Sequence, residues 1–166
     1  VDFGVARGLN SRCTIQFSPE ADRRDEIVNR ALFKEVLSIV IEAWTQESFS
    51  HKGEFFKYPV PGWKETNPLE RDRRFHSETG ELIALGITPN TYQKPHPPIY
   101  NMVESVDSHV FSAQQGIAAM CFSLSVGRIK EAWNAYREIA SLTSSRNINN
   151  QNNLAIMRPT YLADTY

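Results

Sequence analysis

The fold of this chain is decided by residues 97–108, which read PPIYNMVESVDS. The apolar run at 99–103 predicts a strand that is buried on both faces, as in a parallel sheet. Ser105 then occupies the position of a helix N-cap. Apolar residues follow on one face of the expected helix, at Val106, Val110 and Ala113. A strand that runs directly into a helix brings backbone N–H groups and the positive end of a helix dipole together, so this junction predicts an anion site.

The rest of the chain alternates strands with helices. Strands are expected at 1–5, 118–122 and 153–161, and helices at 18–44, 105–115 and 126–142. In the first helix the apolar residues recur at helical spacing, at Val28, Leu32, Val36, Ile39 and Ala43. This order predicts an α/β fold with a parallel sheet and right-handed crossovers. A doubly wound sheet and a piece of a (β/α)₈ barrel both satisfy it, but no G-x-G-x-x-G fingerprint follows any strand, which counts against a dinucleotide-binding sheet.

Residues 45–96 interrupt the alternation. We expect residues 1–166 to form a single domain that contains this stretch as an insertion or lid, because a long connection in a compact domain usually has a function. Two short strands are expected within it, at 53–58 and 81–87, paired with each other as a hairpin. His51 and His76, also in the insertion, are expected at the surface.

Composition and charge exclude several classes of protein. The 166 residues carry a formal net charge of -1, which argues against a surface for nucleic acid or acidic membrane. No run of apolar residues approaches the length of a membrane span. Cys13 and Cys121 are too few and too far apart to suggest a disulfide framework, and no metal-ligand spacing is present, so we expect no metal and a cytoplasmic location.

Both ends of the sequence fall inside a pattern. The chain begins with Val1, in an expected strand, and ends shortly after the strand expected at 153–161. These ends lead us to expect an internal fragment of a longer protein.

Three motifs carry a resemblance to a known family. They are FGVARGL at 3–9, WTQESFSHKGEF at 44–55 and QKPHPPIY at 93–100, followed by Glu104 and Ser105. In this order and spacing the chain resembles the bacterial luciferase-like flavin-dependent monooxygenases. The resemblance implies a (β/α)₈ TIM barrel, a fold of about 250 residues. This chain would supply roughly strands four to seven of that barrel, with a long insertion.

The resemblance also implies a cofactor and its site. Flavin mononucleotide (FMN) would bind at the carboxyl ends of the strands, with its phosphate held by Arg7, Glu104, Ser105 and Ser108 and its ring beside Ala6. Glu104 is expected to contribute its backbone N–H while its carboxylate turns away. From the residues alone, Ser105 could be an N-cap without a ligand, and Arg7 could simply form an ion pair with Asp2 or Glu104.

The activity implied is oxygenation of a small organic substrate, such as an aldehyde, by reduced FMN and O₂. A separate flavin reductase would supply the reduced FMN, and the protein could be a homodimer or a heterodimer. Catalytic residues would come from strands outside this sequence, so none is named and the fragment alone is expected to be inactive. Two alternatives stay open, namely a hydride-transfer oxidoreductase of the same fold that uses the deazaflavin F420, and a non-catalytic flavin-binding or partner subunit.

Overall fold

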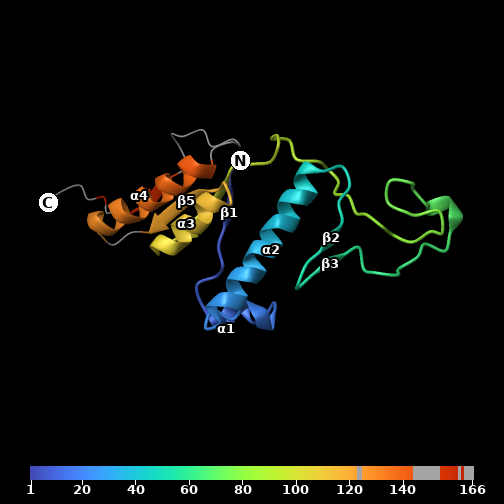
Figure 1. The fold of residues 1–166 in the computed structure, drawn as a ribbon, viewed down its shortest axis with the longest axis horizontal. Helices are drawn as coiled ribbons and strands as arrows, with labels where there is room; N and C mark the ends of the chain where they lie inside the picture. The colour runs from blue at the N-terminus through green and yellow to red at the C-terminus, as the bar shows by residue number, and fades with distance from the viewer. Residues whose placement is uncertain (123–124, 144–153, 161, 163–166) are drawn as a thin grey trace. The chain divides into compact units, whose positions relative to one another are not determined.

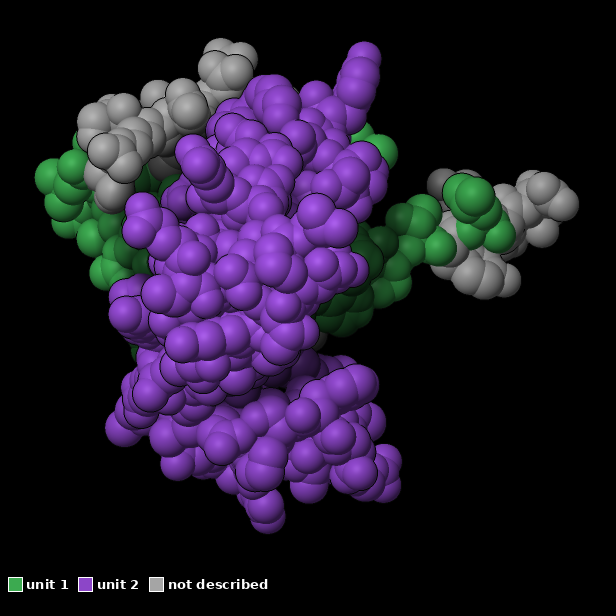
Figure 2. Space-filling view, turned by 90° about the vertical axis from the view of Figure 1, so that its right-hand side faces the viewer, with its two compact units in different colours: residues 1–6, 98–166 green, residues 7–97 purple. Residues whose placement is uncertain are grey.

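The computed structural model describes residues 1–122, 125–143, 154–160 and 162. The chain forms two compact units, one made of residues 1–6 and 98–166 and the other of residues 7–97 (Figures 1 and 2). Strands and helices are mixed in the chain, which confirms the α/β class. No helix in the described ranges is long and apolar enough to cross a membrane.

The first unit is built on a four-stranded parallel sheet. Its strands are β1 (Phe3–Val5), β4 (Ile99–Val103), β5 (Ala118–Phe122) and β6 (Leu154–Met157), and their order in the sheet is their order in the chain. Every neighbouring pair is parallel. The predicted parallel sheet is therefore confirmed. Of the last predicted strand, residues 153 and 161 lie outside the described part of the chain.

Helices α3 (Val106–Gln114) and α4 (Val126–Thr143) pack against each other and on the same face of the sheet. Both helices and two strands contribute to one buried apolar cluster, made of Val103, Ala113, Ala119, Tyr136 and Ala140. The Tyr136 hydroxyl donates to the backbone oxygen of Ile117 over 2.9 Å. The core of this unit thus lies between the sheet and its two helices.

The second face of the sheet differs from the prediction. Ile99, Asn101 and Val103 are 3, 3 and 4% exposed, whereas Met102 between them is 38% exposed. Phe122 and Met157 are also partly exposed, at 39 and 43%. The expectation that β4 is buried on both faces is wrong for this chain, because helices α3 and α4 cover only one face. A sequential strand order with both helices on one face is consistent with part of a barrel.

The ends of α3 lie where the sequence predicts them. Ser105 caps the first turn, with its Oγ accepting from the N–H of Ser108, and Gly116 follows the helix with a positive φ of 69°. The buried side of the helix is more polar than predicted, because Val106 and Val110 are only half-buried. The side chains buried here belong to Ser108, His109, Phe111, Ser112 and Ala113.

The long helix of the second unit, α2 (Glu26–Thr45), starts later than predicted. Its N-cap is Asp25, and residues Pro19–Ala21 form a separate 3₁₀ helix, η1, so the expected start at Ser18 is wrong. The η1 segment packs back on α2, where the Asn29 amide donates to the backbone oxygen of Ala21 over 3.0 Å. The buried face of α2 is consequently turned towards Asn29, and Val36 is left 40% exposed.

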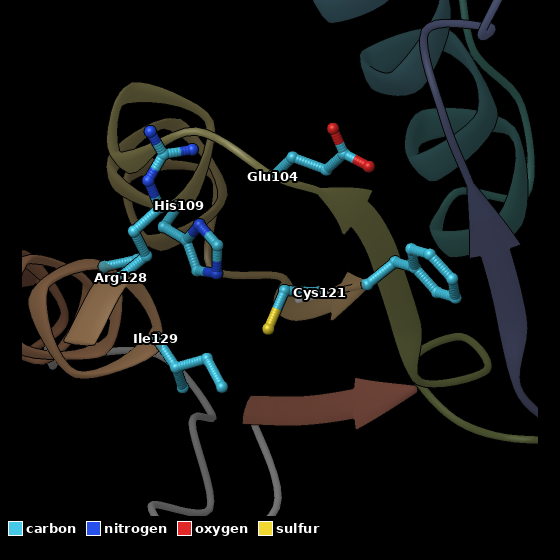
Figure 3. A pocket seen from close by; sticks show the side chains of 7 residues that line it. Glu104, His109, Cys121, Arg128 and Ile129 are labelled. Atoms are coloured by element: carbon cyan, nitrogen blue, oxygen red, sulfur yellow. The ribbon is translucent and has the colours of Figure 1, made fainter. Parts of the chain in front are cut away.

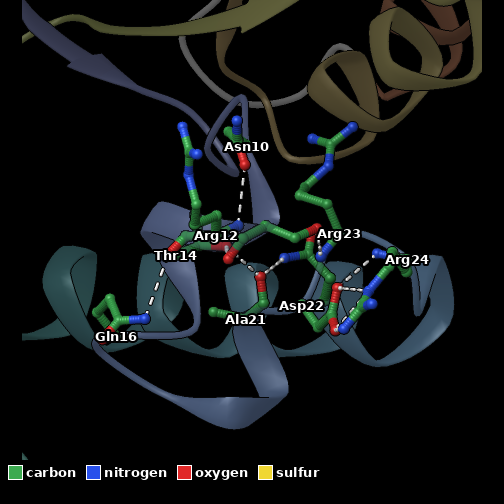
Figure 4. Close-up of polar contacts among 10 residues, drawn as sticks. Asn10, Arg12, Thr14, Gln16, Ala21, Asp22, Arg23 and Arg24 are labelled. Atoms are coloured by element: carbon green, nitrogen blue, oxygen red, sulfur yellow. Dashed lines mark hydrogen bonds and ion pairs between the residues drawn. The ribbon is translucent and has the colours of Figure 1, made fainter.

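The segment between β1 and η1 is held by several side-chain hydrogen bonds (Figure 4). It contains a short helix, α1 (Ser11–Thr14), capped by Asn10. The Thr14 hydroxyl donates to the backbone oxygen of Ala21 over 2.7 Å, and the Arg23 guanidinium donates to that of Gly8 over 3.1 Å. Side-chain bonds to backbone oxygens therefore fix this turn-rich segment.

The predicted hairpin between residues 53–58 and 81–87 is wrong. Instead, β2 (His51–Lys52) pairs with β3 (Lys57–Tyr58) across a tight turn. Residues 81, 82 and 85 form only single bridges with other parts of the insertion, which also contains the 3₁₀ helix η2 (Pro68–Glu70). The turn forms because the Glu35 carboxylate accepts hydrogen bonds from the backbone N–H groups of residues 54–56, at 2.7–3.2 Å.

His51 belongs to this arrangement as well. Its Nε2 lies 3.2 Å from Glu35 Oε1 and its Nδ1 lies 3.6 Å from Glu42 Oε2. The side chain of His51 is only 12% exposed, so the predicted surface position is wrong. A Cβ at Gly53 would collide with Glu35 and His51, which explains the glycine at this position.

Candidate functional site

The junction of β4 and α3 has the geometry of an anion site. Ser105 Oγ accepts from the Ser108 N–H over 3.2 Å and donates to Ser108 Oγ over 2.9 Å. The backbone oxygen of Ser105 accepts from the N–H groups of Ser108 and His109. Helix geometry leaves the N–H groups of Val106 and Asp107 without an intrahelical acceptor. These two donors and the positive end of the helix dipole together favour a negatively charged ligand at this turn.

A buried chain of hydrogen bonds fixes the turn against the sheet. The Asn101 amide of β4 donates to Ser112 Oγ over 2.9 Å, and Ser112 Oγ donates to the backbone oxygen of Ser108 over 2.9 Å. Asn101 is 3% exposed and Ser112 is fully buried. Sequence reasoning missed both residues, although a polar Asn at the centre of an apolar strand is a signal for such a bond, because buried polar groups need partners.

His109 is bound directly to the same turn. Its Nδ1 lies 2.9 Å from the backbone oxygen of Ser105. A carbonyl oxygen can only accept, so Nδ1 carries the hydrogen and Nε2 of the neutral ring is an acceptor. Burial lowers the pKa of His109, against a smaller opposite effect of the Ser105 bond. The imidazole is 1% exposed, and within the described part of the chain Nε2 has no hydrogen-bond partner.

A small cavity opens beside His109, at the carboxyl ends of β4 and β5 (Figure 3). Its volume is about 60 Å³, and its lining includes Glu104, His109, Cys121, Phe122, Arg128 and Ile129. In Figure 3 the carboxylate of Glu104 is directed away from His109 and Arg128. Ligands of parallel α/β folds usually bind at this end of the strands.

Arg7 and Ala6 lie at the end of β1, where the chain passes from one unit to the other. Ala6 is exposed. The Arg7 side chain is only 11% exposed and forms an ion pair with Glu26 over 2.9 Å, and its Nη1 also donates to Asn29 Oδ1 over 3.3 Å. The sequence suggested Asp2 or Glu104 as partners of Arg7, and the structure gives Glu26 instead.

This environment shifts the pKa of the Arg7 guanidinium. Burial, together with the nearby charge of Arg23, lowers the pKa of Arg7, and Glu26 partly offsets the decrease. The turn residues Glu104, Ser105 and Ser108 form one cluster within the first unit, whereas Arg7 belongs to the second unit. A ligand on Arg7 would have to share the guanidinium with Glu26.

No protein-family model and no curated protein matches this sequence. Among solved structures, the chain is similar to the oxygenating constituent of 3,6-diketocamphane monooxygenase from the CAM plasmid of Pseudomonas putida. That protein is a type II Baeyer-Villiger monooxygenase and was solved in complex with FMN. The TM-score is 0.63 at 15% sequence identity, over 93% of this chain and 38% of that chain. The likeness shows a shared fold, and this chain spans well under half of its neighbour's length.

Proposed function

We propose that this chain is the central part of a (β/α)₈ barrel that belongs to a luciferase-like, flavin-dependent monooxygenase. The observation that carries the proposal is the capped turn at Glu104 and Ser105, which follows a parallel strand and leaves two backbone donors at a helix start. The fold shared with an FMN-bound monooxygenase supports the same assignment. In a barrel, the partly exposed face with Met102 and Phe122 would be the interior, completed by strands outside this chain.

The turn suits the phosphate of FMN. The backbone N–H groups of Val106 and Asp107 would point at a phosphate placed at the helix start. The Ser108 hydroxyl is the acceptor in its bond with Ser105, so its own hydrogen is left to donate to a phosphate oxygen. The backbone N–H of Glu104 would complete the shell. A dianion is stabilised by such charge-assisted hydrogen bonds.

The second unit would contribute through Arg7 and the insertion. Arg7 would add a guanidinium to the phosphate, with Glu26 holding it in position when no anion is bound. The exposed, small Ala6 would leave space for the flavin ring. Residues 45–96 would form a lid that excludes water from the site.

Bound reduced FMN would supply the oxygen chemistry, and a flavin reductase would supply the reduced FMN. The described residues would hold and orient this cofactor for a small organic substrate. No side chain of this chain is assigned to the chemical step.

The proposal is tested by titrating the chain with FMN and with riboflavin, which lacks the phosphate. We expect FMN to bind more tightly than riboflavin. Arg7→Ala should weaken the binding of reduced FMN by about 1.5–3 kcal/mol, typical of a hydrogen bond to a charged group. Arg12→Ala, which removes a charge from the nearby short helix α1, is the matched control and should have little effect. Equal affinity for FMN and riboflavin would contradict the phosphate assignment.

The same turn would accept the phosphate of the deazaflavin F420, so cofactor identity needs its own measurement. A 5-deazaflavin spectrum and hydride transfer without oxygen uptake, in a protein that contains the missing strands, would replace the monooxygenase by the F420-dependent alternative. Flavin binding without oxygen uptake in that protein would indicate the non-catalytic subunit.

A further inference from the structure

The cavity beside His109 contains a hydrogen-bond acceptor that the described residues leave unsatisfied. His109 is 1% exposed, and its Nδ1 is used by Ser105, so Nε2 can only accept while the ring is neutral. Figure 3 shows the imidazole turned into the space between Arg128 and Cys121. A buried acceptor without a donor is unfavourable, so this position calls for a ligand that brings a hydrogen.

A positively charged residue, the exposed Arg128, also lines this cavity. Arg128 is in the first turn of α4, an 18-residue helix whose N-terminal end carries the positive pole of its dipole. No carboxylate in the described ranges lies within ion-pair distance of Arg128. Besides His109 and Arg128, the titratable groups of the lining are the carboxylate of Glu104, which is directed away, and the thiol of Cys121. The cavity therefore favours an anion.

The size of the cavity limits the ligand. A volume of about 60 Å³ is roughly what four or five ordered waters need, which is enough for a group the size of a phosphate but not for a flavin ring. No group of three metal-binding side chains was found among the described residues. A small oxyanion fits the volume, the charge and the unsatisfied acceptor together.

We propose that this cavity binds a phosphate-sized oxyanion, which shares one proton with Nε2 of His109 and accepts hydrogen bonds from Arg128. A hydrogen phosphate would donate its P–OH to Nε2, and its remaining oxygens would face the guanidinium. This contact is a hydrogen bond, so binding forms and breaks no covalent bond. Ser105 and Ser108 are not among the lining residues, so this is a second site beside the phosphate turn, with which it shares Glu104, and its argument does not use the flavin assignment.

The test measures the binding of inorganic phosphate to the 166-residue chain by calorimetry. Arg128→Gln should weaken phosphate binding at least tenfold. Lys130 is exposed on the same helix and does not line the cavity, so Lys130→Gln removes the same charge as a control. This variant should change phosphate affinity less than twofold. Circular dichroism of each variant shows that the fold is kept.

A second measurement follows the His109 ring itself in the wild-type chain. Phosphate should shift the ring resonances of His109 in the wild-type chain, identified by their loss in His109→Gln. Equal weakening by the two charge variants, or His109 resonances that phosphate leaves unmoved, would overturn the site. Competition arms identify the source of the oxyanion: if FMN displaces phosphate and riboflavin does not, the site takes a cofactor phosphate, and if neither does, it takes the free ion.

Discussion

The buried bond between Asn101 and Ser112 gives the sharpest prediction for stability. Asn101→Ala removes an amide that is 3% exposed and donates over 2.9 Å. Ser112 Oγ keeps its bond to the backbone oxygen of Ser108, so the loss is one neutral hydrogen bond, about 1 kcal/mol, and the cost of the space left behind. We expect the free energy of unfolding to fall by about 2 kcal/mol.

Ser112→Ala should lower the free energy of unfolding by about 1–3 kcal/mol, because the buried amide of Asn101 would then have no acceptor. In the double variant the two losses should not add, and the coupling energy should be about 1 kcal/mol. Urea unfolding followed by circular dichroism measures all three variants. Asn134→Ala, at an exposed position of α4, is the control and should stay within about 0.5 kcal/mol of the wild type.

Two results would refute the reasoning. If Asn101→Ala costs no more than Asn134→Ala, the amide contributes nothing that a surface amide does not. If the losses at Asn101 and Ser112 are strictly additive, the two side chains do not interact in solution, and the turn is not fixed to β4 through them.

Three further predictions concern other parts of the chain. Gly8→Ala should destabilise more than Gly62→Ala in urea unfolding, because both have a positive φ but only at Gly8 would a Cβ collide with Thr14. Burial raises the pKa of the Glu35 carboxyl, but the hydrogen bonds from the backbone N–H groups of residues 54–56 outweigh this effect, and the net pKa lies below 4.5. The hydrogen-bonded carboxylate therefore stabilises the fold above pH 4.5, and this stabilisation is lost as pH falls through the folded-state pKa. Melting temperatures across acid pH should show that loss in the wild type and less of it in Glu35→Gln. Burial lowers the pKa of His109 from 6.5, so the folded state should lose stability as pH falls below 6.5, and the same melting series on His109→Gln should lack this decrease.

The sequence predicted the elements whose signals are local. The strand at 99–103, the N-cap at Ser105 and the helix expected at 105–115 are each set by neighbouring residues, and all three are confirmed. The late start of α2 follows from contacts that a pattern of single residues does not contain. Asp25 caps that helix, and the chain before it folds back on Asn29.

The polar interior was not predictable from apolar periodicity. Asn101, Ser112 and His109 would each pass for a surface residue in a pattern of polar and apolar letters, yet all three are at most 3% exposed. Asn101 and Ser112 bond to each other across β4 and α3, and His109 bonds to the backbone oxygen of Ser105. The bond between β4 and α3 is known only once the two elements are packed. The hairpin of β2 and β3 was missed for the same reason, since the Glu35 carboxylate that binds its turn comes from helix α2, about 20 residues earlier.

The pairing of β1 with β4 has a consequence for how the whole molecule can vary. The N–H of Phe3 donates to the backbone oxygen of Pro98 over 2.8 Å, so residues 7–97 leave the first unit and return to it at neighbouring points. Closing a longer or shorter loop between such points changes the free energy only slowly with length. The segment 7–97 can therefore change in length at little cost in closure free energy, while the β4–α3 junction and its buried amide keep their contacts.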